Sequence, residues 1–388
     1  MNEFVRFYEE NGISPVSQDI SDLELHIKRR ERLYRLLGID SRLFKDADIL
    51  EVGAGSGYNT LVFLLLGAKV DIVEPNPVGR KEMQKLFDNY SIDPKRYRIY
   101  DCVIEKYESS KKYDFVIAEG FLPAFGDSER EKILQALLKQ VSHNTYLILT
   151  TICEFSYFFE YLRIVLGLCL VREVSNFSNK VQKLCVAFKS HLDSLGFASR
   201  PIEDWVKDSI LNPTNDHFSY SLKKSAEDIR KFSIYNKEVG RFDVIGISPN
   251  FILNLSWYKD MGYSYIDAVI EQFDCKKYLL LSTEFKEMNL NQKTIGWLSD
   301  NVVQLRLLVH KLRKNVDFSI IEAIVELLQQ MSNNCFQLGE FFVESLRECI
   351  ELLKNPLELT EYKISAMPNF SRAWGRGQQY MSIKAIIE

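Results

Sequence analysis

The sequence has few histidines, no long apolar run and no strong excess of charge of either sign. The histidines are dispersed and show no ligand spacing, so we expect no metal site: His26, His143, His191, His217 and His310. The seven cysteines are never spaced as C-x-x-C, which predicts reduced thiols rather than disulfides or zinc ligands. The formal net charge of -4 disfavours nucleic acid as a partner.

The longest apolar stretch, residues 164–171, is far shorter than the roughly 20 residues that a bilayer requires. The first twelve residues are charged and do not resemble a secretory signal, so we expect a cytoplasmic protein without a membrane segment. A chain of 388 residues exceeds the usual size of one hydrophobic core. Two domains, or one core with large insertions, are therefore expected.

The segment ADILEVGAGSGYNTLVFLLLGAKVDIVEPNP contains three glycines in five residues: Gly53, Gly55 and Gly57. Residues 49–52 before them predict a buried strand, and the residues after them predict a helix that ends at Gly67. Glycines let the backbone approach a ligand, and the amides at a helix start are free to donate. Glu74, at the end of the second strand, can accept hydrogen bonds from both hydroxyls of a ribose. This segment therefore predicts a nucleoside site.

The dinucleotide pattern G-x-G-x-x-G fails in this loop, because Tyr58 stands where its last glycine would be. The loop instead resembles motif I of the class I S-adenosylmethionine-dependent methyltransferases, E/D-x-G-x-G-x-G, with Glu51 as the acid. This resemblance implies S-adenosyl-L-methionine as the cofactor. It also implies an α/β fold with a doubly wound, seven-stranded, mostly parallel sheet. A glycine turn without a ligand is the disfavoured alternative.

The resemblance further implies which residues contact the cofactor. Asp101 ends a third strand, where members of the family accept a hydrogen bond from the adenine amino group. Motif IV falls at Glu119 and Gly120, where AEGF replaces N/D-P-P-Y/F and disfavours the DNA and protein amide methyltransferases. The predicted cofactor-binding residues are Glu51, Gly53, Ala54, Gly55, Gly57, Glu74, Pro75, Asp101, Cys102, Val103, Glu119 and Arg30.

Residues 21–40 predict an amphipathic helix ahead of motif I, with its leucines and Ile27 inward and its basic residues on the other face. The inward positions are Leu23, Ile27, Leu33 and Leu36 or Leu37. Arg29, Arg30 and Tyr34 are the candidates to reach the methionine carboxylate of the cofactor; a solvated charged face is the alternative. An oxygen acceptor would require a general base, for which Glu119 is the first candidate and His26 the second.

The strand and helix pattern divides the chain into six segments. They are an N-terminal helical segment (1–46), a Rossmann-like core (47–151), a helical insertion (152–220), a core helix with the sixth strand (221–250), a second mainly helical insertion (251–368) and a closing strand (369–388). Ser225 is the predicted cap of the core helix. Both insertions are candidate lids over the site, but for residues 302–353 we favour packing on the core or a homodimer face.

Two polar aromatic clusters are candidates for acceptor binding. Their candidate residues are Trp257, Tyr258, Lys259, Arg372, Trp374, Arg376, Gln378 and Gln379, although Gly375 and Gly377 also suit a simple turn into the last strand. Because two insertions can enclose a compact substrate, we expect a methyltransferase that acts on a small-molecule or saccharide-like acceptor. The alternatives are a protein or peptide methyltransferase and a non-catalytic S-adenosylmethionine-binding or assembly module.

Overall fold

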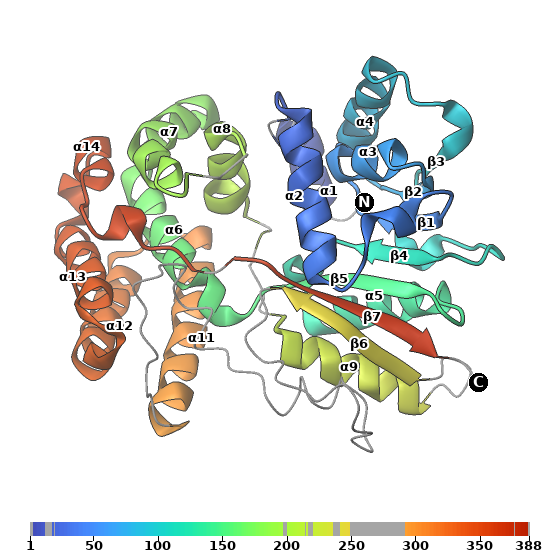
Figure 1. Ribbon diagram of the computed structural model, residues 1–388. Helices are drawn as coiled ribbons and strands as arrows, with labels where there is room; N and C mark the ends of the chain where they lie inside the picture. Colours follow the sequence, from blue (N-terminus) through green and yellow to red (C-terminus); the bar gives the residue numbers. More distant parts are fainter. Residues whose placement is uncertain are drawn as a thin grey trace. The chain divides into compact units, whose positions relative to one another are not determined.

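The computed structural model describes residues 3–11, 18, 20–196, 200–213, 215, 220–235, 241–248, 292–375 and 377–386. The chain divides into two compact units. The sheet unit comprises Met1–Cys153, Phe218–Asp274 and Gln378–Glu388, and the helical unit comprises Glu154–His217 and Cys275–Gly377. Figure 1 shows the elements of both units. No helix among the described residues has both the length and the apolar character to cross a bilayer.

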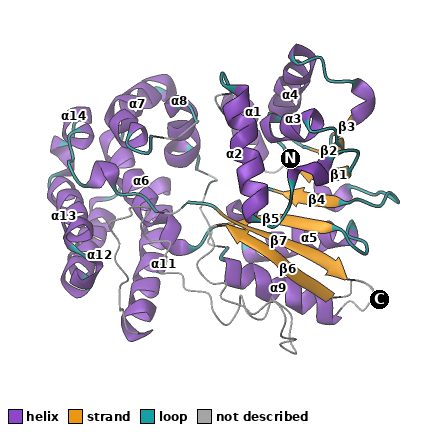
Figure 2. Cartoon of the chain, viewed as in Figure 1, coloured by secondary structure: helices purple, strands orange, loops and turns teal. Residues whose placement is uncertain are grey.

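The sheet unit is built on seven strands in the order β3-β2-β1-β4-β5-β7-β6 (Figure 2). The strands are β1 (Asp48–Val52), β2 (Lys69–Val73), β3 (Tyr97–Tyr100), β4 (Phe115–Ala118), β5 (Tyr146–Thr151), β6 (Arg241–Ser248) and β7 (Gln379–Ile386). The first five strands are parallel, and β7 is antiparallel to both β5 and β6. The predicted doubly wound, mostly parallel sheet is therefore confirmed.

Helices flank this sheet because its central strands are apolar on both faces. All four residues of β4, FVIA, are buried. The helices are α1 (Glu3–Asn11), α2 (Leu23–Leu36), α3 (Tyr58–Leu65), α4 (Pro77–Asn89), α5 (Asp127–Lys139) and α9 (Leu222–Tyr235). The helix α9 begins earlier than predicted. Ser225 lies inside it, and Ser221 instead accepts a hydrogen bond from the Lys224 amide at 3.1 Å, so the predicted cap was wrong.

The buried face of α2 contains more than the predicted apolar residues. Leu23 and Leu33 pack against the core and Leu37 is fully buried, as predicted, whereas Leu36 is 55% exposed. The buried side chains within the helix are His26, Arg30 and Tyr34. His26 and Arg30 face inward because they meet a carbonyl and a carboxylate partner, so hydrophobicity alone missed part of the buried face.

The C-terminal end of α2 is packed closely against β6 and β7. A Cβ atom on Gly246 would lie 2.4 Å from the Leu37 carbonyl carbon, a distance that side chains do not tolerate. On β7, Ser382 Oγ donates to the Leu37 carbonyl oxygen at 2.5 Å. This contact places the buried face of α2 beside the strands that carry the site.

The helical unit combines both insertions. Its helices are α6 (Phe158–Leu170), α7 (Phe177–Asp193), α8 (Ile202–Trp205), a π-helix (Val206–Leu211), α11 (Gln292–Lys314), α12 (Phe318–Asn334), α13 (Glu340–Lys354) and α14 (Glu361–Ser365). Arg163 of the first insertion donates to the Phe370 carbonyl at 3.1 Å and lies 3.5 Å from the Trp374 ring centroid. Residues 369–377, which we expected in the core with the closing strand, therefore belong to the helical unit.

Candidate cofactor and active site

The loop after β1 has a backbone that requires glycine. Gly53, Gly55 and Gly57 have φ angles of 72°, 56° and 78°, in the left-handed region that other residues rarely adopt. A Cβ atom on Gly53 would lie 2.7 Å from the Phe121 ring, so space as well as conformation excludes a side chain there. The three glycines of the predicted motif thus form one tight loop at the carboxyl end of β1.

Glu74 holds this loop in place. It follows β2, is 4% exposed, and accepts hydrogen bonds from the Gly55 and Asn76 amides, both at 2.7 Å. Burial raises the pKa of Glu74, while the two amides oppose that shift. A carboxylate has about four acceptor positions, so two remain for a ribose. The predicted ribose contact of Glu74 is compatible with this geometry and remains a prediction.

Asp101 lies one residue after β3 and is linked to Glu74 through Arg80. Arg80 Nη1 is 2.7 Å from Asp101 Oδ1 and donates to the Glu74 carbonyl at 2.8 Å. The Asp101 side chain is 71% exposed, and the next two residues, Cys102 and Val103, are half-buried. Arg80 was not predicted from the sequence, because a lone arginine in the first turns of a helix usually indicates only a solvated surface.

The strongest polar contact of the site joins α2 to the end of β4. Arg30 Nη2 donates to the two carboxylate oxygens of Glu119 at 2.6 and 2.7 Å, and both side chains are less than a tenth exposed. Tyr34 Oη donates to Glu119 at 3.0 Å, and Asn59 Nδ2 donates at 3.4 Å. Arg30 Nε is buried and has no acceptor among the described residues. Arg29, the other arginine considered for this role, is exposed.

This geometry bears on the predicted general base. The Glu119 carboxylate faces a buried guanidinium and accepts two further hydrogen bonds, so its oxygens are already occupied by neighbouring side chains. His26 Nε2 lies 3.1 Å from the Tyr58 carbonyl oxygen, which can only accept, so this nitrogen carries the proton. Burial lowers the pKa of His26, and the charges of Arg30 and Arg29 lower it further.

Glu51, the acid of motif I, has fewer hydrogen-bond and charge partners than the carboxyl groups of Glu74 and Glu119. It is 3% exposed, and its Oε2 atom has no hydrogen-bond partner in the described part of the chain. Burial raises the pKa of Glu51 to about 8. The group is therefore largely protonated at neutral pH and can donate a hydrogen bond as well as accept one.

Tyr380 of β7 and Gln378, which precedes that strand, also lie at this site. The sequence predicted a strand here and Gln378 as a candidate for acceptor binding. Tyr380 Oη donates to Gln378 Oε1 at 2.9 Å. Burial raises the pKa of Tyr380 to about 12, and the charge of Glu119 adds to the shift. Gln378 Nε2 lies 3.9 Å from where a Cβ atom of Gly120 would be. A neutral phenol and an exposed amide thus stand beside the end of β4.

Two of the residues predicted to bind the acceptor, Arg372 and Trp374, belong to the helical unit. Trp374 is 5% exposed, and its indole N–H donates to Ser194 Oγ at 3.1 Å, so it is a core residue of the helical unit. Arg372 is exposed and donates to the Pro368 carbonyl at 3.0 Å. Trp257, Tyr258 and Arg376 lie outside the described residues. Among the residues that the structure places, no three His, Cys, Asp or Glu side chains gather as metal ligands.

A profile of the family described as "Methyltransferase domain" matches residues 26–220, half of the chain. The chain belongs to this family. Its match covers the glycine loop, Glu74 and the Arg30–Glu119 pair, and it confirms the predicted resemblance and S-adenosylmethionine as the cofactor.

Individual relatives resemble the chain only locally. A protein-L-isoaspartate O-methyltransferase of Flavobacterium johnsoniae is 46% identical over 57 residues, which cover 15% of this chain and 27% of that protein. The chain thus matches about a quarter of the length of this curated relative. Magnesium protoporphyrin IX methyltransferase of Synechocystis PCC 6803 aligns at 15% identity over 39% of this chain and 69% of its own, with a TM-score of 0.29. The N-methyltransferase NodS of Bradyrhizobium japonicum WM9 aligns at 13% identity over 33% and 62%, with a TM-score of 0.28.

Proposed function

We propose that the protein is an S-adenosylmethionine-dependent methyltransferase that acts on a small-molecule or saccharide-like acceptor. The observation that carries this proposal is the loop of three glycines held by Glu74 beside the buried Arg30–Glu119 pair, all at the carboxyl ends of the strands. In an α/β sheet this edge is where ligands bind. The family match makes this edge the expected cofactor site.

The cofactor supplies an electrophilic methyl group on a sulfonium, and the chain must align the acceptor with it. Glu74 would accept from the ribose hydroxyls, and Asp101 would lie at the adenine. The unpaired Nε of Arg30 leaves a donor for the methionine carboxylate while Nη2 stays on Glu119. Displacement at a methyl group requires chiefly that the acceptor, the methyl carbon and the sulfur are aligned and that water is excluded, so a site built from buried groups suits this reaction.

The acceptor would lie beside Gly120, against Gln378 and Tyr380. Gln378 Nε2 can donate to an acceptor oxygen, and Tyr380 fixes the amide by donating to its oxygen. The two buried charges nearby, Arg30 and Glu119, cancel each other. This neutral, hydrogen-bonding surface favours a neutral, hydroxyl-bearing acceptor over an ionic one.

In this proposal Glu119 is a positioning residue that orients Arg30 and Tyr34, and it is not the general base. His26 remains the base proposed for an oxygen acceptor, because its ring is held neutral by burial and its second nitrogen is not used by Tyr58. A nucleophilic acceptor, such as an amine, would need no base.

The test has two parts. First, calorimetry should show that the chain binds S-adenosylhomocysteine, and that Glu74→Gln weakens this binding about tenfold to a hundredfold, the cost of a lost hydrogen bond to a charged group. The control, Glu105→Gln, changes an exposed carboxylate and should leave the affinity unchanged. Absence of binding by the folded wild-type chain would refute the proposal.

Second, release of S-adenosylhomocysteine is measured with three acceptor panels: hydroxylated small molecules, saccharides and peptides that contain isoaspartate. The peptide panel tests the alternative suggested by the 57-residue match to the isoaspartate enzyme. Turnover with the peptides but with neither of the other panels would show that the acceptor is a peptide and not a small molecule or a saccharide. Binding without turnover in any panel would favour a non-catalytic S-adenosylmethionine-binding module.

A further inference from the structure

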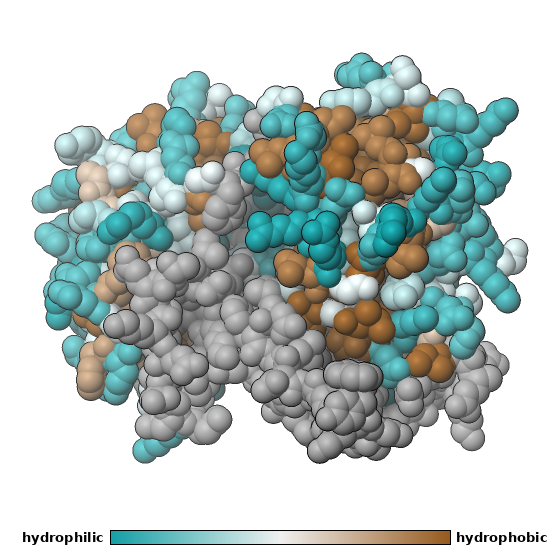
Figure 3. Space-filling view, viewed as in Figure 1, coloured by the Kyte–Doolittle hydropathy of each residue, from teal (hydrophilic) through white to brown (hydrophobic). Residues whose placement is uncertain are grey.

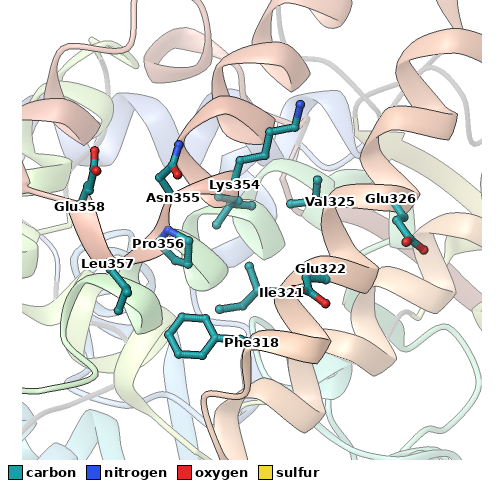
Figure 4. A pocket seen from close by; sticks show the side chains of 11 residues that line it. Phe318, Ile321, Glu322, Val325, Glu326, Lys354, Asn355, Pro356, Leu357 and Glu358 are labelled. Atoms are coloured by element: carbon teal, nitrogen blue, oxygen red, sulfur yellow. The ribbon is translucent and has the colours of Figure 1, made fainter.

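The helical unit has an apolar groove that plays no part in the proposed methyl transfer. A cavity of about 560 Å³ lies between one face of α12 and the short helix Pro356–Glu358 (Figure 4). Its floor is formed by buried aliphatic side chains: Ile321, Val325 and Leu353. Phe318 and Leu357 stand at its edge and remain 46% and 67% exposed. Such exposed apolar surface next to a groove is typical of a docking site.

Carboxylates surround this apolar floor. Glu322 and Glu326 lie one turn apart on α12, Glu358 lies on the opposite side, and Lys354 is the one cation among the lining residues (Figure 4). The charge extends beyond the groove, because residues 317–363 carry nine carboxylates and three cations, a formal charge of -6. The whole chain carries -4, so this stretch attracts a basic partner.

The sheet unit has a surface with the complementary composition. One stripe of α2 is exposed and has helical spacing: Leu25, Lys28, Arg29, Arg32 and Leu36. Two leucines thus bracket three cations, on the face opposite the buried residues of the site. Figure 3 shows hydrophilic and hydrophobic side chains gathered over this helix.

We propose that the groove binds α2 of a second copy of this chain. The groove spans residues 318–326 of α12, about 12 Å at 1.5 Å per residue, which accommodates about two turns of a partner helix. Glu322 and Glu326 are one turn apart, as are Arg29 and Arg32, so two ion pairs form while a leucine covers Phe318. Groove and stripe are different surfaces, so the contact is heterologous, and association continues beyond two copies unless a ring closes.

Sedimentation of the full-length chain over a range of concentrations tests the proposal. The mean mass should rise with concentration, and high salt should reduce association, because exposed ion pairs are screened. Glu322→Lys with Glu326→Lys should weaken association at least about tenfold. A matched control, Glu105→Lys with Glu108→Lys, makes the same charge change on exposed residues outside both the groove and the acidic stretch and should have little effect.

Charge reversal on the exposed stripe of α2 completes the test. It also distinguishes a lost contact from a misfolded variant, because only folded variants can associate when mixed. Arg29→Glu with Arg32→Glu should also abolish association, and mixing the two double variants should restore it. A chain with all four substitutions should associate again. The proposal is overturned if the wild-type chain is monomeric throughout, if the groove variant associates normally, or if the mixture remains monomeric.

Discussion

Three carboxyl groups at neighbouring strand ends illustrate how surroundings determine the role of one residue type. Glu74 accepts two backbone amides, Glu119 faces a guanidinium, and Glu51 has one oxygen without a partner. Glu74 therefore holds the glycine loop in place, Glu119 is one half of a buried ion pair, and Glu51 is a weak acid. Sequence alone identified all three positions, but only the contacts separate their roles.

Arg30→Met should destabilise the sheet unit strongly. The substitution leaves the Glu119 carboxylate buried without its counter-charge, which costs about 3–5 kcal/mol of unfolding free energy. Urea denaturation measures the loss. The double variant Arg30→Met with Glu119→Gln should recover most of it, and Arg29→Met, at an exposed position, should change stability by less than about 0.5 kcal/mol. Equal losses in the single and double variants would contradict this explanation.

Glu51 should make stability depend on pH. Its pKa is about 8 in the folded chain and 4.5 in an unperturbed side chain, so the folded state binds more protons between these values. The free energy of unfolding contributed by Glu51 therefore falls as pH rises from about 4.5 to about 8, on the order of a few kcal/mol in total. Glu51→Gln should flatten this slope and stabilise the chain at pH 8. An unchanged pH profile of urea midpoints would show that Glu51 does not titrate in this range.

The site could be predicted in part. The sequence predicted the glycine loop and the acids at the strand ends, because each of these patterns depends on residues that are close together in the sequence. Tyr380 and Asn59 were missed, since their proximity to Glu119 depends on tertiary contacts between residues 261 and 60 positions apart. Trp374 was misassigned because an aromatic residue near glycines suits a pocket and a core equally well.

At the scale of elements, β7 is the piece that completes the sheet. Its apolar and aromatic run predicted a strand, and the strand order confirms that it pairs with β5 and β6. The strands followed from the apolar runs in the sequence, which are a local property. The polar part of the buried face of α2 did not, because His26 and Arg30 are stabilised by partners that are distant in sequence.

Gly246→Ala tests how tightly β6 and α2 are joined. The new methyl group would lie 2.4 Å from a backbone carbon of Leu37, so one element must move. We expect a loss of about 1–3 kcal/mol, typical of overpacking, together with weaker binding of S-adenosylhomocysteine, because α2 carries Arg30. Gly296→Ala, at a helical position with open space around it, is the control and should not destabilise the chain. If Gly246→Ala binds S-adenosylhomocysteine with normal affinity, the position of α2 does not affect cofactor binding.

At the scale of the molecule, the chain consists of two units that interrupt each other in sequence. Both helical insertions contribute to a single core, in which Arg163 is fully buried and donates to the carbonyls of Phe370 and Ser371 at 3.1 and 3.4 Å. One arginine therefore ties the first insertion to the second. Sequence patterns predicted the helices but not their common core, which depends on contacts across 207 and 208 residues.

Arg163→Met should destabilise the helical unit selectively. The two carbonyls lose their donor, at a cost of about 1–3 kcal/mol, although the hydrophobic packing is kept. Tryptophan fluorescence reports mainly this unit, because three of the four tryptophans lie in it: Trp205, Trp297 and Trp374. The fluorescence transition should shift to lower temperature, while the transition stabilised by S-adenosylhomocysteine stays in place. A common shift of both transitions would show that the units unfold together.

The position of β7 between β5 and β6 also has a consequence during protein synthesis. Thr151 of β5 and Gln379 of β7 are hydrogen-bonded partners 228 residues apart. At 5–20 residues per second, a ribosome needs roughly 10–45 s to make the intervening chain, including the whole helical unit. Throughout this delay the growing chain has an unpaired edge at β5, and β6 emerges before its proper neighbour exists. Premature pairing of β6 with β5 is then the competing outcome, and we expect nascent chains that pause in this interval to depend most on chaperones.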